Sequence, residues 1–244
     1  MDRQLIRRGA RCACIGLLAA LAGACHYLRP AELPLGGEYF HYRESNTRLV
    51  VLLHGLGGSA HNFVRYGTVE QLRTCRPDAN IYGANSHFGY YRERIIGERL
   101  RSDIIEPARR AGVDEVWLMG VSLGAFGGIV YNLQHPRQVE GFVLMAPFLG
   151  EWSELEAYID DPQTYRQNGD AEFAAIWQEL ESMAQQHRRL VLAYGEEDGF
   201  RRQHRWLAGQ LEPHQVVSMP GGHHWSVWRE LWPEALRRSG LCTG

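Results

Sequence analysis

Three residues in this sequence have the types needed for nucleophilic catalysis, and each follows an apolar, strand-like run. Ser122 lies between Gly120 and Gly124, Asp198 lies in a later turn, and His223 follows a pair of glycines near the end of the chain. A serine hydroxyl is nearly inert at neutral pH, so it needs a base to accept its proton and an acid to hold that base in one tautomer. The pattern therefore predicts a catalytic triad in which Ser122 is the nucleophile, with Asp198 and His223 as candidates for the acid and the base.

The stretch around Ser122 predicts a strand, a tight turn and a helix. A mainly apolar run at residues 115–119 precedes the motif, and another at residues 125–131 follows it. In such a turn the serine adopts a strained backbone conformation that exposes its hydroxyl above a sheet, and the flanking glycines are needed because a Cβ would clash. In a chain with 27 glycines the motif alone could arise by chance. The strand–turn–helix context favours the nucleophile.

Neighbouring residues offer alternatives for two members of the triad. Glu197 directly precedes Asp198 and could be the acid, and His224 directly follows His223 and could be the base. Two adjacent histidines could also belong to a metal site, but no other Cys, His or Asp stands at ligand spacing from them. We therefore expect no bound metal ion.

At this point the sequence resembles the α/β-hydrolase superfamily. The elbow at Ser122, the acid turn at Asp198 and the Gly-His turn occur in that superfamily's order, and His54 begins a His-Gly-x-Gly-Gly loop after the first strong strand. The resemblance covers nearly the whole chain after residue 35. It implies that Ser122 is the nucleophile, that His223 is the general base and that Asp198 orients this histidine. It also implies that the backbone N–H groups of Leu56 and Leu123 form an oxyanion hole, and that the His54 side chain braces its loop.

The elements that must position these residues alternate along the chain. Apolar, β-branched runs predict strands at residues 48–53, 80–85, 116–119, 139–145, 189–194 and 216–218. Helical patterns occupy residues 59–75 and 92–111 and begin again at residue 225. This alternation predicts an α/β protein, with a mostly parallel sheet covered by helices on both faces, in a hydrolase domain over residues 36–244.

About 43 residues separate the strand that ends at Met145 from the one that starts at Arg189, more than one crossover needs. They include an excess of acids and several aromatic residues, among them Trp152, Tyr158, Tyr165, Phe173 and Trp177. We expect a small helical cap at about residues 147–188, over the edge of the sheet where open α/β sheets hold ligands. The alternative is a crossover helix with extra surface residues, whose aromatic side chains belong to the ordinary hydrophobic core.

The last predicted helix has an apolar stripe at helical spacing, made of Trp225, Trp228, Leu231, Trp232 and Ala235. The stripe could form an aromatic wall of a substrate pocket, or it could be buried against the sheet. The spacing favours burial.

Composition excludes several classes of function. The net charge of −2 gives no indication of a nucleic-acid partner. The chain contains no lysine, which excludes Schiff-base catalysis and the lysine-terminated phosphate loop of nucleotide hydrolases. No Gly-x-Gly-x-x-Gly follows a strand, so a dinucleotide site is not indicated, and we expect no cofactor.

Residues 1–24 have the pattern of an export signal. Four arginines precede an apolar stretch of about 13 residues, whereas a membrane-spanning helix needs roughly 20. The residues before Cys25 resemble the lipobox of bacterial lipoproteins. This resemblance implies that Cys25 is lipidated and that residues 25–35 form a tether. Because His26 follows the cysteine, it also implies that the protein is anchored to the outer membrane of a Gram-negative cell. The alternative is a plain secretory signal. In an oxidising compartment Cys75 and Cys242 could pair or remain buried thiols.

Together these features predict an exported serine hydrolase that cleaves carboxylic esters through an acyl-enzyme on Ser122. Its partner would be a small-molecule or lipid ester, with a membrane contact through Cys25. One alternative keeps the triad in an acyltransferase or a peptidase. Another alternative is a surface lipoprotein whose hydrolase fold binds a ligand without catalysing a reaction. The presence of all three triad residue types argues against such a loss of catalytic activity.

Overall fold

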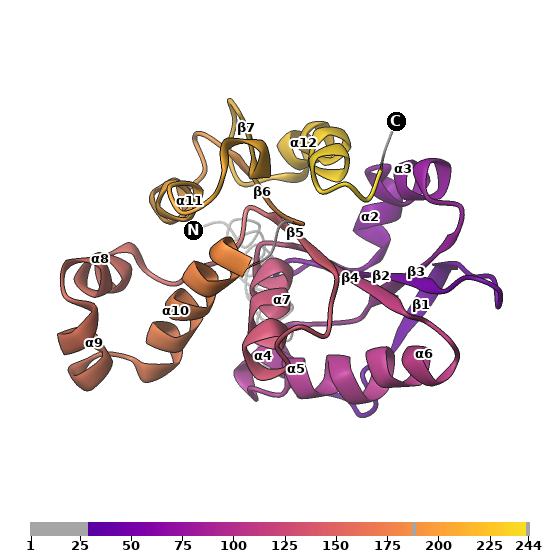
Figure 1. Cartoon of the computed structure of the whole chain (residues 1–244), viewed down its shortest axis with the longest axis horizontal. Coiled ribbons are helices and arrows are strands. Elements are labelled where there is room, and N and C mark those ends of the chain that lie inside the picture. Colours follow the sequence, from indigo (N-terminus) through magenta and orange to yellow (C-terminus); the bar gives the residue numbers. More distant parts are fainter. Residues whose placement is uncertain (1–28, 187–188, 243–244) are drawn as a thin grey trace, which may run out of the picture.

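A computed structural model describes residues 29–186 and 189–242; the predicted export signal and Cys25 lie outside the described residues. The described chain forms a seven-stranded sheet in the order β1-β3-β2-β4-β5-β6-β7 (Figure 1). The strands are β1 (Gly37–His41), β2 (Arg48–Leu53), β3 (Ala79–Ala84), β4 (Glu115–Val121), β5 (Gly141–Met145), β6 (Leu190–Gly195) and β7 (Val216–Met219). Only β1 runs antiparallel to its neighbour, and every other pairing in this sheet is parallel.

The central strands are apolar along nearly their whole length because helices cover both of their faces. In β2 the register pairs Leu53 with Ala84 of β3 on one side and with Gly120 of β4 on the other. The carboxyl ends of β2 and β4 therefore meet at one edge of the sheet, which brings the loop after Leu53 beside the turn after Gly120.

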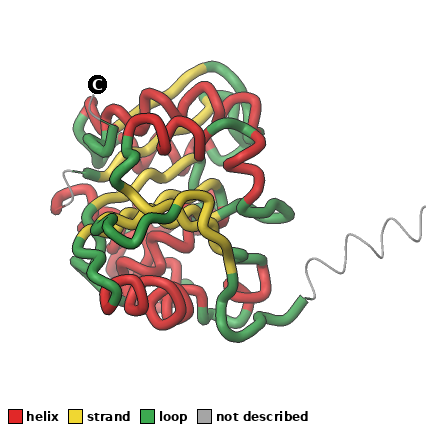
Figure 2. The backbone as a smooth tube through the Cα atoms, turned by 90° about the vertical axis from the view of Figure 1, so that its right-hand side faces the viewer, coloured by secondary structure: helices red, strands yellow, loops and turns green. Residues whose placement is uncertain are grey.

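Helices pack on both sides of the sheet, as Figures 1 and 2 show. One side carries α4 (Phe88–Arg92), α5 (Ile96–Arg99), the π-helical segment η1 (Leu100–Ile105), α6 (Glu106–Arg110) and α7 (Leu123–Gln134). The other side carries α2 (His61–Arg65), α3 (Thr68–Cys75) and α12 (Trp225–Arg238). The connection from β6 to β7 contains α11 (Arg201–Ala208) and the short 3₁₀ helix η2 (Pro213–Gln215). The predicted mostly parallel sheet with helices on both faces is confirmed.

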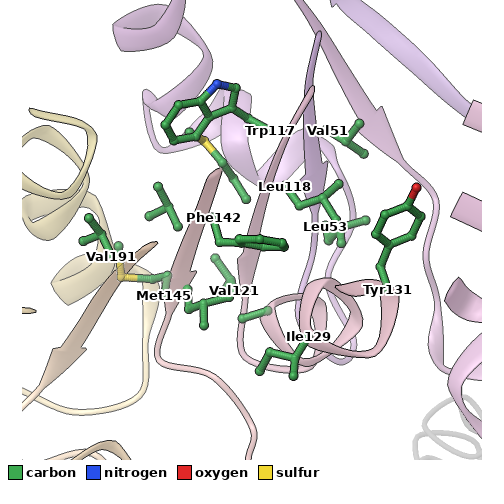
Figure 3. Packing of buried hydrophobic residues seen from close by; sticks show 14 of the residues in the cluster. Val51, Leu53, Trp117, Leu118, Val121, Ile129, Tyr131, Phe142, Met145 and Val191 are labelled. Atoms are coloured by element: carbon green, nitrogen blue, oxygen red, sulfur yellow. The ribbon is translucent and has the colours of Figure 1, made fainter. Parts of the chain in front are cut away.

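Large side chains pack around the central strands and against α7. Trp117 of β4, Phe142 of β5 and Tyr131 of α7 have no exposed surface, and Figure 3 shows them in one cluster with Val121 and Ile129. Full burial of an apolar side chain of this size stabilises the fold by about 1.5–3 kcal/mol. The strand and the helix that flank Ser122 are therefore held at the centre of the core.

Residues 152–186 form three helices at the edge of the domain: α8 (Trp152–Asp160), α9 (Pro162–Asn168) and α10 (Ala171–Gln186). Rings of Tyr158, Tyr165 and Trp177 pack against one another with centroids 5.2 to 6.0 Å apart. The Trp177 indole N–H donates to the Leu149 carbonyl at 2.9 Å. Asn132 of α7 donates to Glu179 of α10 at 2.6 Å. These helices thus form a small unit of their own that is attached to the helix following Ser122.

The structure differs from the sequence-based elements in three places. The predicted helix 59–75 is interrupted at Gly67, whose φ of 84° is unfavourable for residues with a Cβ. The predicted helix 92–111 is broken into shorter pieces, with Arg94 at φ 57°. The edge strand β1 was not predicted.

The segment predicted as tether up to residue 35 is partly packed on the domain. Leu35 is buried, and its backbone N–H donates to the Asp103 carboxylate at 2.7 Å. The backbone N–H of Ala31 donates to Glu93 at 3.0 Å. The packed body therefore begins several residues before the predicted boundary at residue 36.

Cys75, at the end of α3, and Cys242, after α12, form a disulfide with their Cα atoms 5.3 Å apart. This contact ties the end of the described chain to the outer face of the domain. Within residues 29–186 and 189–242, no helix has the length and apolar character to cross a membrane.

Candidate active site

Ser122 lies in the turn between β4 and α7, with φ 53° and ψ −115°. Residues other than glycine rarely adopt this backbone conformation. It costs on the order of 1–3 kcal/mol and is found where the surrounding structure enforces it. A Cβ on Gly120 would overlap the backbone of Gly124, and a Cβ on Gly124 would overlap the Leu53 carbonyl. The two glycines thus allow β4, α7 and the end of β2 to converge beneath the serine.

Three predicted residues meet in one line of hydrogen bonds. The His223 Nε2 lies 2.9 Å from the Ser122 hydroxyl oxygen, and the His223 Nδ1 lies 2.7 Å from Asp198 Oδ2. With an ionised carboxylate as partner, Nδ1 carries a proton and donates it, which leaves Nε2 as the acceptor for the serine proton. The arrangement provides a hydroxyl that is hydrogen-bonded to a base in the required tautomer.

The Asp198 side chain is fully buried. Burial alone would raise the pKa of its carboxyl, but hydrogen bonds from His223 and from the backbone N–H of Phe200 outweigh that effect, so the pKa lies below its usual value. Asp198 therefore remains an anion at neutral pH. The negative charge can stabilise the imidazolium that forms when His223 accepts a proton.

Backbone contacts and aromatic rings fix the histidine next to its acid. The backbone N–H of Glu197 donates to the Gly221 carbonyl at 2.9 Å, which joins the acid turn to the histidine turn. The His223 ring has Phe200 on one side and Trp228 on another, with centroids 5.3 and 4.8 Å away and near-perpendicular planes. The imidazole therefore has little freedom to leave the line between Asp198 and Ser122.

The alternative acid and the alternative base lie outside this line. Glu197 is exposed, and its side chain makes no hydrogen bond to either histidine among the described residues. The Nδ1 of His224 instead pairs with the Ser226 hydroxyl at 2.6 Å. The geometry therefore favours Asp198 and His223.

Two backbone amides predicted for the oxyanion hole border the same cavity. Leu56 follows β2 and Leu123 begins α7, and both line the space in front of Ser122. Within the described chain neither amide donates a hydrogen bond to another protein group. Free N–H groups at this position are suited to binding a developing negative charge.

His54 lies at the start of the same loop and is buried. Its Nδ1–H donates to the Gly55 carbonyl at 2.9 Å. Gly55 in turn approaches Ser122 closely enough that a Cβ on the glycine would lie 3.4 Å from the serine Cβ. This bond lies within the loop that carries Leu56.

A cavity of about 770 Å³ opens in front of Ser122. Its walls are mainly aromatic and apolar, and no Asp, Glu or Arg lines it; the lining residues are Gly55, Leu56, Gly58, Tyr66, Phe88, Ser122, Leu123, Phe148, Phe200, His223, His224, Trp225, Ser226 and Trp228. An apolar cleft of this volume, with a few converging polar groups, has the character of a small-molecule site.

Two findings at the cavity differ from the sequence-based picture. The stripe on α12 is buried at Trp228, Leu231, Trp232 and Ala235 as expected, but its first two members, Trp225 and Trp228, also line the cavity. Of the predicted cap segment, residues 147–188, Phe148 lines the cavity, but the helices α8, α9 and α10 contribute no lining residue within the described chain. Phe173 of α10 instead contacts Phe148 from behind, with ring centroids 6.3 Å apart. The small helical unit therefore supports one wall and does not cover the opening.

Sequence reasoning missed the four other aromatic residues of the cavity wall: Tyr66, Phe88, Phe148 and Phe200. Two of them had a usable signal, because Phe148 and Phe200 shortly follow β5 and Asp198, at the edge of the sheet where ligands bind.

His204, also missed, is fully buried behind the acid turn, and its Nε2–H donates to the Pro147 carbonyl at 2.9 Å. Burial lowers its pKa to about 4, so His204 is neutral at physiological pH. Its bond connects α11 with the loop that carries Phe148.

No group of three or more His, Cys, Asp or Glu side chains in the described residues is arranged to hold a metal ion. The chemistry that the site can perform with its own side chains is nucleophilic attack by Ser122, assisted by the His223 imidazole.

No protein-family model matches this sequence, and no curated protein sequence shows a significant match to it. Solved structures are similar over most of the chain. A CIB-like hydrolase from Thermoplasma acidophilum aligns with a TM-score of 0.57 at 17% identity, covering 86% of this chain and 99% of that one. The α/β hydrolase MGS-MChE2, from a sediment metagenome of the Mar Chica lagoon in Morocco, gives 0.56 at 16% identity, with coverages of 86% and 98%. A monoacylglycerol lipase from Paleococcus ferrophilus gives 0.53 at 16% identity, with coverages of 84% and 99%.

These similarities, together with the strand order and the elbow at Ser122, establish that the chain has the α/β-hydrolase fold.

Proposed function

We propose that this protein is a serine hydrolase that cleaves carboxylic esters. The observation that carries the proposal is the line of hydrogen bonds from Asp198 through His223 to Ser122, at the opening of an apolar cavity. The structural neighbours support the same class of chemistry, because their descriptions include a hydrolase and a lipase.

In the first half of the reaction, His223 Nε2 removes the hydroxyl proton as Ser122 Oγ attacks the ester carbonyl. The carbonyl oxygen becomes an oxyanion and accepts hydrogen bonds from the N–H groups of Leu56 and Leu123. The tetrahedral intermediate then collapses. Its bond to the alcohol oxygen breaks, the alcohol leaves with the proton from His223, and an acyl group remains on Ser122.

In the second half, water takes the place of the alcohol. His223 accepts a proton from this water as its oxygen attacks the acyl-enzyme, and a second oxyanion forms in the same hole. The bond to Ser122 Oγ breaks, and the serine regains its proton from His223. The products are a free carboxylic acid and the unmodified enzyme.

The cavity favours uncharged, largely apolar esters. Since none of its lining residues is Asp, Glu or Arg, a charged substituent would lose hydration without gaining an ionic partner. The aromatic walls instead offer extensive apolar surface to an acyl chain.

The proposal includes export of the protein and a lipid anchor at Cys25. It is supported by the sequence pattern of residues 1–25 and by the Cys75–Cys242 disulfide, since such bonds persist mainly in oxidising compartments. Metabolic labelling with a fatty acid, compared between the wild type and Cys25→Ser, tests the anchor. The proposed anchor requires label on the wild type alone.

The test of the proposed function is hydrolysis of a series of p-nitrophenyl esters with increasing acyl-chain length. The wild type should release p-nitrophenol with a burst that approaches one equivalent where deacylation limits the rate, and Ser122→Ala should reduce turnover by at least about 10³-fold. Absence of turnover by a folded wild type on every ester would contradict the proposal.

A further inference from the structure

The apolar cavity contains a polar pair that the proposed reaction does not use. His224 and Ser226 both line the cavity, on either side of Trp225, and their side chains are bonded to each other through His224 Nδ1 and Ser226 Oγ at 2.6 Å. Both residues are exposed, so their remaining polar atoms are accessible to a ligand. The pair stands out because the rest of the cavity wall is mainly aromatic and apolar.

The bond within the pair determines what it can offer. If the Ser226 hydroxyl donates to Nδ1 of His224, the imidazole keeps an Nε2–H donor and the serine oxygen keeps its acceptor sites. If Nδ1–H donates to the serine, Nε2 becomes an acceptor and the hydroxyl becomes a donor. In either tautomer the pair presents one free donor and one free acceptor.

A group that both donates and accepts complements this arrangement. An alcohol hydroxyl does so, whereas a carboxylate only accepts and an ammonium only donates. The cavity also has no charged side chain that would compensate an ionic ligand. The hydrogen-bonding capacity of the pair is therefore suited to a neutral hydroxyl.

The position of the pair determines which half of an ester it would contact. His223 Nε2 must deliver a proton to the departing alcohol oxygen, so the alcohol has to lie beside this ring. His224 is the next residue, and Ser226 lies at the start of the helix that carries Trp228 against the His223 ring. The acyl chain, which remains on Ser122, occupies the rest of the aromatic cavity.

From the hydrogen-bonding capacity and the position of this pair, and resting on the proposed function, we infer that His224 and Ser226 recognise a second hydroxyl on the leaving alcohol. The preferred substrates are esters of polyhydroxylic alcohols, such as glycerol or a sugar. Trp225, stacked on Tyr66 with ring centroids 4.8 Å apart, provides the adjacent apolar surface for the carbon skeleton.

The test compares esters that share one acyl group and differ in the alcohol: glyceryl monobutyrate, 6-O-butyryl-glucose and ethyl butyrate. Release of butyric acid is titrated at constant pH, and kcat/KM is obtained for each ester. The variants are Ser226→Ala and His224→Ala, with Ser153→Ala as a matched control, because Ser153 is exposed on α8 and outside the cavity. Phosphonate labelling of Ser122 shows that each variant is folded.

The measured quantity is the ratio of kcat/KM for a polyol ester to kcat/KM for ethyl butyrate. This ratio should fall about three- to tenfold in each cavity variant, as expected for loss of one hydrogen bond between neutral groups, and should not change in Ser153→Ala. A fall for the glycerol ester alone or for the sugar ester alone identifies the alcohol that the pair binds.

Unchanged ratios for both polyol esters, in variants that still hydrolyse ethyl butyrate, overturn this inference and leave the proposed function intact. Absence of hydrolysis of all three esters by the folded wild type overturns both. Equal losses on all three esters assign the pair a structural role instead and also overturn the inference.

Discussion

Replacing Asp198 with asparagine tests how the acid controls the histidine. The carboxylate accepts one hydrogen bond from His223 Nδ1 and another from the backbone N–H of Phe200, at 2.7 and 2.8 Å. An asparagine that keeps its oxygen toward Phe200 directs its NH₂ group at Nδ1. The imidazole must then accept at Nδ1 and carry its proton on Nε2, where it cannot accept a proton from Ser122.

The opposite orientation of the asparagine does not rescue the site. Its oxygen would face His223, but the buried N–H of Phe200 would then face an NH₂ group, and an unsatisfied buried donor costs about 1–3 kcal/mol. The negative charge that stabilises the imidazolium is lost in both orientations. We expect kcat of Asp198→Asn to fall by about 10³–10⁴-fold, equivalent to about 4–5.5 kcal/mol in the activation free energy.

Steady-state hydrolysis of p-nitrophenyl butyrate, with thermal unfolding to confirm the fold, measures this effect. Glu197→Gln is the matched control, because Glu197 is an adjacent but exposed acid, and kcat should remain within about twofold of the wild type. The reasoning is refuted if folded Asp198→Asn retains more than about a tenth of wild-type kcat. It is also refuted if Glu197→Gln causes the larger loss.

Three further predictions concern stability. Gly124→Ala should lower the melting temperature by several degrees in a calorimetric scan, because overpacking costs about 1–3 kcal/mol, whereas Gly199→Ala, with nothing within 4 Å of the new Cβ, should not. Buried His204, with its pKa lowered to about 4, stays neutral in the folded state while the unfolded chain gains a proton below about pH 6.5. Stability should therefore fall by about 2 kcal/mol between pH 7 and pH 5 in the wild type, measured by urea unfolding, more than in His204→Gln. Reducing the Cys75–Cys242 bond should cost about 2–4 kcal/mol, measured by thermal unfolding with and without reductant.

Each stability prediction has a contrary outcome. Equal melting temperatures for the two glycine variants would mean that the close approach beneath Ser122 relaxes at little cost. If the unfolding free energies of the wild type and His204→Gln changed with pH in parallel, this histidine would not resist protonation in the folded state. Two free thiols in the unreduced, denatured protein would mean that the disulfide does not form.

Local signals in the sequence were sufficient to predict the strands β2 to β7 and to identify candidate site residues. Apolar runs such as residues 48–53 predict buried strands because helices cover both faces of a parallel sheet. Gly120 and Gly124 mark the turn because any larger residue would clash there. Asp198 and His223 could be identified because the sequence shows the order of the three candidate residues and the type of turn that carries each one, although Asp198 and His223 are 25 positions apart.

Features that depend on packing between distant segments were not predictable in the same way. The edge strand β1 and the buried Leu35 are held by partners at least 40 residues away. The small helical unit was predicted to cover the site, but nothing in the composition of α10 shows that Phe173 would pack behind Phe148. The aromatic wall likewise draws on separate loops that only the folded sheet brings together.

The most direct test of the central claim is the site and rate of covalent labelling by a fluorophosphonate. The account predicts a single phosphonyl adduct on the peptide that contains Ser122, and a labelling rate that falls by at least about 10²-fold in His223→Ala. An adduct on a different residue, or equal labelling rates for the wild type and His223→Ala, would contradict the claim that His223 activates Ser122.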